Sequence, residues 1–169
     1  MKSIIFIVQQ LSQPRCIKRI QSFYERGYKV KVYGFDNGLY NASLKELPFP
    51  VTEIIKRDKR ASKLQKIKFF ISTIKRIRSI NSKDDIFYLF GFEIASLAYL
   101  VGYRNYIYEE ADVSAARIKN KSIRNLLLKL DRLVINHSLC TIFTSYGFVN
   151  YLFKKNPPKN IILLPNKLS

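Results

Sequence analysis

Short apolar runs alternate with amphipathic stretches along most of the chain. The first run, Ile4–Val8, is unbroken, which is typical of a strand buried on both faces. Pro14 suits the first turn of a helix, and apolar residues then recur at helical spacing until Gly27, which favours a helix end. Val30, Val32 and Tyr33 then indicate a second strand. A strand, a helix and a strand joined this closely predict a right-handed βαβ unit and a parallel sheet.

The same alternation continues to the end of the chain. Further strands are predicted at 51–55, 86–90, 106–108, 139–144 and 161–164. Helices are predicted between them at 56–80, 94–101, 115–119, 122–136 and 146–153. We therefore expect a doubly wound, Rossmann-like α/β three-layer sandwich with about seven parallel strands in the order 3-2-1-4-5-6-7. We expect residues 1–169 to form a single domain.

Two of the predicted helices have apolar faces that we expect to pack on the sheet. On 122–136 this face consists of Ile123, Leu126, Leu127, Leu130, Leu133 and Val134. On 56–80 it consists of Leu64, Ile67, Phe70, Ile71, Ile74 and Ile77.

The rest of segment 56–80 is strongly basic, with Asp58 as its one acid. One interpretation is a helix docked on the sheet with a solvated basic face. The other adds contact between this face and anionic lipid headgroups, with Phe69 reaching the lipid interface from outside the apolar stripe. The residues expected at a membrane are Lys63, Lys66, Phe69, Lys75, Arg76 and Arg78.

Charge and composition narrow the class of protein. Lys and Arg total 30 against 12 Asp and Glu, a formal net charge of +18, which predicts an anionic partner. No apolar run is long enough to span a bilayer, and the start of the chain lacks the pattern of a signal peptide, so we expect a cytoplasmic protein. Cys16 and Cys140 have no metal-ligand spacing, and we expect reduced thiols.

The turn after the first strand argues against a dinucleotide cofactor. It carries Gln and Ser residues where a G-x-G-x-x-G turn would let a pyrophosphate approach the backbone. Asp36 follows the second strand, where a ribose-binding acid would lie, and it also fits a turn-forming role before Asn37. We expect neither NAD nor FAD.

Four stretches in order resemble one known family. They are 13–15 with 25–32, the acidic strand end 108–112, the pair 131–135 and 143–145, and Leu164-Pro165-Asn166. Together they resemble the N-terminal half of a GT-B glycosyltransferase of the family-4 type, over essentially the whole chain. Two departures are Gln10-Leu11-Ser12, where relatives carry a glycine pair, and the acids at 110–112, where many carry a His.

The resemblance implies the acceptor-binding domain of a hexosyltransferase-like enzyme in cell-surface polysaccharide synthesis. Such an enzyme transfers a sugar from a nucleotide sugar to a glycan or lipid-linked acceptor. The donor would bind a C-terminal domain that residues 1–169 do not include, so we expect a fragment that is inactive alone and holds no cofactor or metal. The expected partners are the acceptor, the donor-binding domain and an anionic membrane, with a peripheral position on the inner face of the plasma membrane.

The strand ends supply the candidate site residues. Those expected to bind the acceptor are Gln9, Gln10, Ser12, Arg15, Asp36, Gly91, Glu93, Ser145 and Tyr146. Glu110 and Asp112 are the candidates to orient or deprotonate an acceptor hydroxyl, and their alternative is a role as ordinary strand-end and capping acids. His137, at a predicted helix end, is expected to be structural.

Two other classes of function stay open. The charge permits a nucleic-acid-binding α/β domain without catalysis, and it permits a plain interaction module. We expect no nucleic-acid partner, because the basic residues concentrate on one predicted helix and no RNP, KH or zinc-finger signature occurs.

Overall fold

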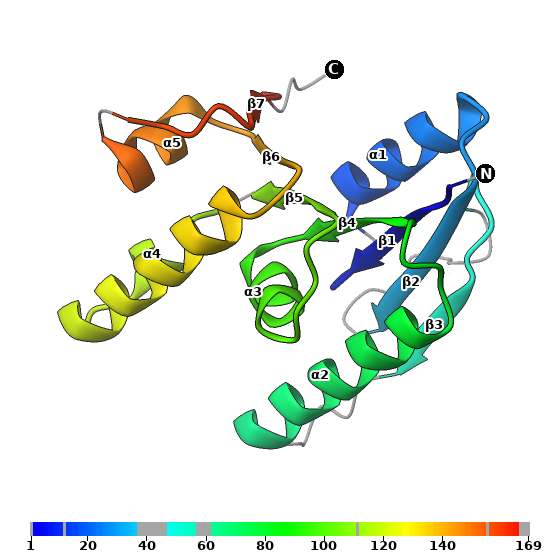
Figure 1. The fold of residues 1–169 in the computed structure, drawn as a ribbon, viewed down its shortest axis with the longest axis horizontal. Helices are drawn as coiled ribbons and strands as arrows, with labels where there is room; N and C mark the ends of the chain where they lie inside the picture. Colours follow the sequence, from blue (N-terminus) through cyan, green and yellow to red (C-terminus); the bar gives the residue numbers. More distant parts are fainter. Residues whose placement is uncertain are drawn as a thin grey trace. The chain divides into compact units, whose positions relative to one another are not determined.

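The computed structural model describes residues 2–11, 13–36, 47–56, 62–110, 112–154 and 156–165. Within these ranges the strands form a seven-stranded sheet in the order β3-β2-β1-β4-β5-β6-β7, and each pairing with a described register is parallel (Figure 1). This confirms the Rossmann-like three-layer α/β fold and the predicted strand order. The chain divides into two compact units, Met1–Leu89 and Phe90–Ser169. The expectation of a single domain stays a prediction.

The first unit is built around β1. This strand pairs with β2 on one side, Ile4 opposite Val30, and with β4 on the other, Ile4 opposite Ile86. All five of its residues are buried, as the unbroken apolar run predicted. The strands of this part of the sheet are β1 (Ile4–Val8), β2 (Val30–Asp36), β3 (Glu53–Lys56) and β4 (Ile86–Phe90).

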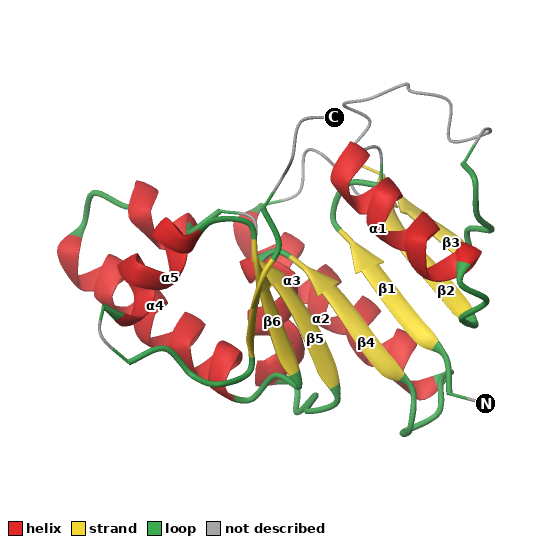
Figure 2. Ribbon diagram, turned by 90° about the horizontal axis from the view of Figure 1, so that it is seen from above, coloured by secondary structure: helices red, strands yellow, loops and turns green. Residues whose placement is uncertain are grey.

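Helices cover both faces of these strands. α1 (Pro14–Glu25) lies on one face and α2 (Lys63–Ser79) on the other (Figures 1 and 2). α1 begins at its proline and ends before Gly27, which has a positive φ of 78°, as predicted. Aromatic contacts join this helix to the sheet, since the Phe23 ring lies 5.7 Å from the Phe6 ring.

α2 is shorter than the helix predicted at 56–80. Ser62 is its N-cap, and it forms a capping box with Gln65 in which each side chain accepts the other residue's backbone N–H. Lys56 instead ends β3, opposite Asp36 in β2, and 57–61 lie outside the described residues. Of the predicted apolar face, Phe70, Ile74 and Ile77 are buried while Leu64 and Ile67 are exposed.

The second unit contains the strands β5 (Tyr106–Glu110), β6 (Cys140–Phe143) and β7 (Ile161–Leu163). Its helices are α3 (Phe92–Leu100), the 3₁₀ helix η2 (Ser114–Arg117), α4 (Lys121–Asn136) and α5 (Tyr146–Phe153). Most boundaries fall within two or three residues of those predicted. Ser114 is the first residue of η2, and Asn120 is the N-cap of α4.

The predicted packing face of α4 is wrong in part. Val134 is buried as expected, but the other fully buried residues of the helix are Asp131 and Ile135. Two buried tyrosines of β5 explain the orientation, since the Tyr106 hydroxyl donates to the Val134 carbonyl (2.6 Å) and the Tyr108 hydroxyl to Asp131 Oδ1 (3.3 Å). Ile123, Leu126 and Leu133 remain exposed.

None of the helices in the described ranges combines the length and the apolar character that crossing a bilayer requires.

Candidate functional site

Six of the predicted site residues belong to the second unit, and they lie at or just after the ends of β4, β5 and β6. Glu110 closes β5 opposite Phe143, the last residue of β6, so the segments that follow these strands begin at the same edge. The backbone N–H of Gly91, directly after β4, donates to the Glu109 carbonyl (3.0 Å). This unit-2 strand-end group comprises Gly91, Glu93, Glu110, Asp112, Ser145 and Tyr146.

The two acids proposed for catalysis have different environments. The side chain of Glu110 is fully buried, as is that of its neighbour Glu109. Asp112 is partly exposed and forms an ion pair with Arg117 in η2. Because burial keeps solutes from Glu110, Asp112 is the acid of the two that an acceptor in solution can reach. Its partner Arg117 is also exposed, so the pair contributes little to stability.

Gly91 leaves open space at the start of α3. Its backbone has φ 85° and ψ 153°, a conformation that favours glycine, and a Cβ built there would meet nothing within 4 Å. Glu93 is exposed in the first turn of the same helix, where an acid is favourable next to the unpaired N–H groups. A side chain at position 91 would occupy space next to these N–H groups.

Ser145 and Tyr146 begin α5. The Ser145 hydroxyl accepts a hydrogen bond from the N–H of Gly147 (3.2 Å), so Ser145 caps the helix. Tyr146 is exposed and presents both an aromatic face and a hydroxyl group.

In the first unit, a different contact positions the loop after β1. Gln9 and Gln10 are half-buried, and Leu11 behind them is buried against Gly34 of β2. A Cβ at Gly34 would lie 2.9 Å from Leu11 Cδ2 and 3.1 Å from Leu11 Cβ, so the loop needs a glycine at that position. The contact was missed from the sequence, although a glycine inside a strand can signal a close approach of this kind.

Three other predicted residues of the first unit are less informative. Arg15 is half-buried in the first turn of α1. Ser12 lies outside the described residues, and of Asp36 only the backbone, which ends β2, is described.

The residues expected at a membrane divide into two groups. The Arg76 guanidinium contacts both carboxylate oxygens of Glu53 (2.8 and 2.9 Å), and Phe69 packs edge-on against Phe35 with ring centroids 6.1 Å apart. Both side chains therefore make contacts within their own unit. Lys75 and Arg78 are exposed and Lys66 is half-buried, while the side chain of Lys63 is not described.

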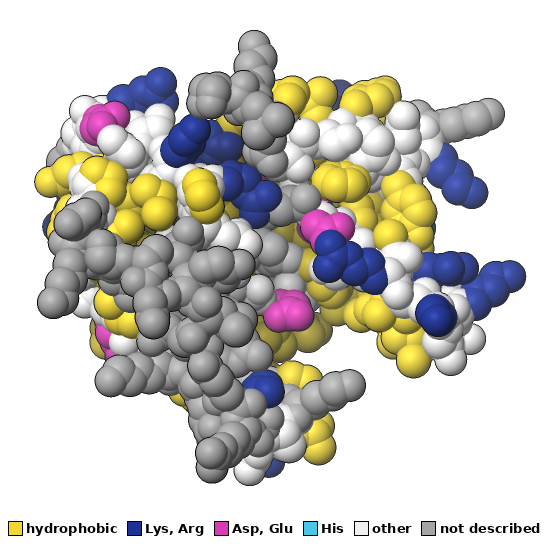
Figure 3. Space-filling view, turned by 180° about the vertical axis from the view of Figure 1, so that it is seen from behind, with side chains coloured by type: hydrophobic (Ala, Val, Ile, Leu, Met, Phe, Trp, Pro, Cys, Tyr) yellow, Lys and Arg dark blue, Asp and Glu magenta, His cyan; other side chains and the backbone are white. Residues whose placement is uncertain are grey.

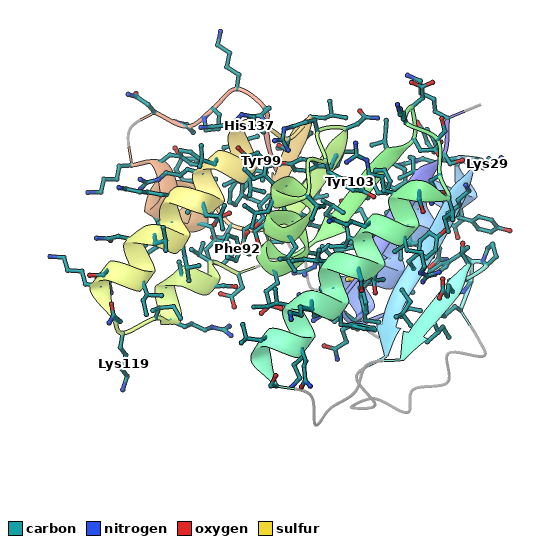
Figure 4. All side chains as sticks on the ribbon, turned by 60° about the horizontal axis from the view of Figure 1, so that its bottom comes forward. Lys29, Phe92, Tyr99, Tyr103, Lys119 and His137 are labelled. Carbon is teal, nitrogen blue, oxygen red and sulfur yellow. The ribbon has the colours of Figure 1, made fainter. Side chains whose placement is uncertain are left out.

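His137 lies where α4 ends. Its Nδ1 is 2.8 Å from the Leu133 carbonyl, and its ring centroid is 5.1 Å from that of Tyr99 (Figure 4). Arg104 stacks on the same tyrosine, 4.4 Å from the ring centroid. These contacts give His137 a structural role at the end of a helix.

Burial changes the acid–base properties of several groups in the second unit. It raises the pKa of Asp131 to about 7, although Arg132 acts in the opposite direction. It also raises the pKa of the Tyr106 hydroxyl and of the Cys140 thiol. Within the described ranges, no group of three or more His, Cys, Asp or Glu side chains is arranged to hold a metal ion.

Comparison with known proteins places the fold. No protein-family model matches the sequence, and no curated protein matches it. Among solved structures, Anabaena HepE in complex with UDP matches 99% of the chain at a TM-score of 0.63 and 13% identity. The S. aureus MnaA–UDP structure matches 96% at a TM-score of 0.66 and 12% identity. An α,α-trehalose-phosphate synthase (UDP-forming) from Burkholderia vietnamiensis matches 91% at a TM-score of 0.58 and 8% identity.

The fold is GT-B-like. The chain covers only 44%, 44% and 43% of these three proteins, so it corresponds to less than half of each of them. At such low identity the likeness establishes the fold alone. The family-4 type and the acceptor-side role therefore rest on the sequence motifs.

Proposed function

We propose that this chain is the acceptor-binding domain of a glycosyltransferase that uses a nucleotide sugar and acts in cell-surface polysaccharide synthesis. The observation that supports this most directly is the unit-2 strand-end group. It combines open space at Gly91, an accessible carboxylate at Asp112 and an exposed aromatic side chain at Tyr146. Strand ends are where ligands bind in open α/β sheets. The UDP-bound neighbours with a similar fold agree with this proposal.

In the proposed reaction, a hydroxyl of a glycan or lipid-linked acceptor attacks the anomeric carbon of the donor sugar and the bond from that carbon to the nucleoside diphosphate breaks. The hydroxyl proton passes to the Asp112 carboxylate, and the diphosphate leaves. Asp112 accepts a hydrogen bond from that hydroxyl, and its ion pair with Arg117 fixes its orientation. Glu110, buried at the end of β5, supports the strand end and does not contact the acceptor. The donor and its leaving diphosphate bind a separate domain, so the chain alone binds the acceptor without turnover.

We also propose that the protein is cytoplasmic and binds the inner face of the plasma membrane. In the first unit α2 supports this through the exposed cations Lys75 and Arg78 and the exposed Leu64 and Ile67. Arg76 and Phe69 are weaker candidates for lipid contact, since both are engaged within the unit. Figure 3, which views the molecule from the side opposite to Figure 1 and does not identify α2, also shows Lys and Arg side chains beside hydrophobic ones.

Saturation-transfer NMR on the chain tests acceptor binding. The probes are short-chain lipid diphosphates that carry one or two hexoses, with UDP and single-stranded RNA as comparison ligands. We expect the glycolipid probes to bind, and Asp112→Asn and Tyr146→Ala each to weaken binding by about fivefold or more, the value of one lost hydrogen bond or contact. Tyr151→Ala is the matched control, because Tyr151 is also exposed on α5.

Three results would contradict the proposal. Failure of the folded chain to bind any sugar-bearing probe would remove the acceptor role. UDP binding that is lost in the same two variants would assign a donor site to this chain. RNA binding without binding of the glycolipids would favour the nucleic-acid alternative.

A further inference from the structure

One side of α4 is both apolar and exposed. The exposed fractions of Ile123, Leu126 and Leu133 are 51%, 66% and 46%, and Leu130 between them is half-buried. These positions follow one another at intervals of three, four and three residues, so they form a continuous stripe along the helix. The helix packs through a different side, on which Asp131, Val134 and Ile135 lie. The stripe, Ile123, Leu126, Leu130 and Leu133, is thus not part of the core.

The neighbouring side of α4 is polar and basic. Lys129 is exposed and lies three residues after Leu126 and four before Leu133, which places it directly beside the stripe. Lys121 is also exposed, but it lies on the other side of the first turn of the helix. Lys119 extends away from the ribbon ahead of the first turn (Figure 4). The one acid in the sequence of α4, Asp131, is on the buried side. The exposed apolar stripe therefore lies beside Lys129, with Lys119 just ahead of the helix.

The charge of this surface selects its partner. Protein interfaces with an apolar core are depleted in lysine, whereas helices that lie on membranes combine Leu and Ile with lysine on the adjoining side. The chain as a whole carries a net charge of +18, which an anionic bilayer attracts and a second copy of the same chain repels. A bilayer with anionic headgroups fits both properties of α4.

We propose that α4 is a membrane-binding helix. Ile123, Leu126 and Leu133 enter the boundary between headgroups and acyl chains, and Lys119 and Lys129 lie at the anionic headgroups. The long aliphatic stems of these lysines allow their ammonium groups to stay in the headgroup layer. This surface is separate from α2 and from the unit-2 strand-end group, and the proposal does not depend on the acceptor role.

Vesicle sedimentation of the whole chain is the first test. Vesicles of phosphatidylcholine with and without phosphatidylserine are compared at low and high salt. We expect binding to the phosphatidylserine vesicles that weakens as salt rises. Ile123→Ser, Leu126→Ser and Leu133→Ser combined should weaken it by more than about tenfold, since each removes a side chain from an apolar environment. The control is Leu100→Ser, because Leu100 is also an exposed leucine of the same unit, at 62%.

Depth of insertion separates α4 from α2. The chain contains no tryptophan, so Leu126→Trp introduces a single selective fluorophore. We expect its emission to shift to the blue on vesicle binding and to be quenched by brominated lipid, as an interfacial side chain would be. Leu100→Trp, at a comparable exposed position, should show neither effect. Circular dichroism and the thermal midpoint of each variant verify that it is folded.

Several outcomes would overturn the proposal. One is a vesicle-bound chain in which the tryptophan at position 126 is neither shifted nor quenched, because binding would then use another face. Another is a folded chain that fails to bind phosphatidylserine vesicles at low salt. A third is a chain that forms dimers in solution and becomes monomeric in the triple serine variant without any change in vesicle binding. The NMR result with soluble glycolipid probes is independent of all three.

Discussion

A single buried acid, Asp131, couples the folding of the second unit to pH. It lies on the packing side of α4, where its Oδ1 accepts a hydrogen bond from the Tyr108 hydroxyl (3.3 Å), and burial raises its pKa from 3.8 to about 7. The folded chain therefore holds this proton more tightly than the unfolded chain does. The resulting stabilisation is fully present below pH 3.8 and is lost as the pH rises through about 7.

Asp131→Asn tests this coupling. As the pH rises from 5 to 8, we expect the variant to become more stable relative to the parent chain. The gain in unfolding free energy is at most about 1.4 kcal/mol for each pH unit below the folded-state pKa of about 7. The asparagine keeps an oxygen that can accept the Tyr108 hydrogen bond but no longer titrates. Urea unfolding at both pH values measures the difference. A difference in unfolding free energy that is the same at pH 5 and pH 8 would show that Asp131 is not the coupled group.

Gly34 is a second position where one residue controls local structure. A methyl group there would lie 2.9 Å from Leu11 Cδ2, so Gly34→Ala should push Leu11 away and move the loop that carries Gln9 and Gln10. We expect a loss of about 1–3 kcal/mol in unfolding free energy, the usual cost of overpacking. Backbone amide NMR shifts should change most at residues 9–11.

Gly147→Ala is the matched control for Gly34. Its Cβ would lie 3.4 Å from Ser145 Oγ, an ordinary contact, and the residue is helical, so alanine should be neutral or slightly stabilising. If both substitutions destabilise the chain equally, the close contact with Leu11 is not the reason why position 34 requires glycine.

At the scale of elements, the boundaries that carry their own chemistry could be predicted. Pro14 and Gly27 mark the ends of α1, and Ser145 begins α5. The packing face of α4 could not be predicted, because the helix has two apolar stripes and periodicity alone does not say which is buried. The buried one includes Asp131, and a charged residue argues against burial until the Tyr108 hydroxyl that meets it is known.

The capping box at the start of α2 leads to a prediction at the scale of elements. Ser62 and Gln65 form this capping box. The sequence did not reveal this helix start, because the two residues lie inside a basic segment whose periodicity predicts one long helix. Ser62→Ala should lower the unfolding free energy by about 1 kcal/mol, since it leaves the Gln65 N–H without its acceptor. Denaturant unfolding at neutral pH measures the loss.

Ser72→Ala provides the comparison within the same helix. The Ser72 hydroxyl donates to the Phe69 carbonyl in the middle of α2 and is exposed, so alanine there should change stability little or raise it slightly. If both variants lose the same stability, the effect belongs to serine in general and not to the cap.

The whole molecule shows which features of the site follow from topology. A parallel sheet with the predicted order puts the residues that follow β4, β5 and β6 at one edge, so Gly91, Glu110 and Ser145 could be found from the sequence. The ion pair of Asp112 with Arg117 could not, because it depends on the 3₁₀ turn of η2, which the sequence predicts only as a short helix. Which acid is accessible likewise follows from burial and not from spacing.

The net charge leads to the last prediction, which concerns the stability of the whole chain. With 30 basic and 12 acidic residues, repulsion between like charges opposes the compact state, and salt screens it. The thermal midpoint should therefore rise by several degrees between about 20 mM and 500 mM sodium chloride. Lys75→Glu with Lys129→Glu lowers the net charge from +18 to +14, because each change removes two charges, and should flatten this dependence. A midpoint that falls as salt rises would mean that ion pairs such as Arg76–Glu53 outweigh the repulsion. The charge would then be a source of stability, and an anionic partner would no longer be needed to offset it.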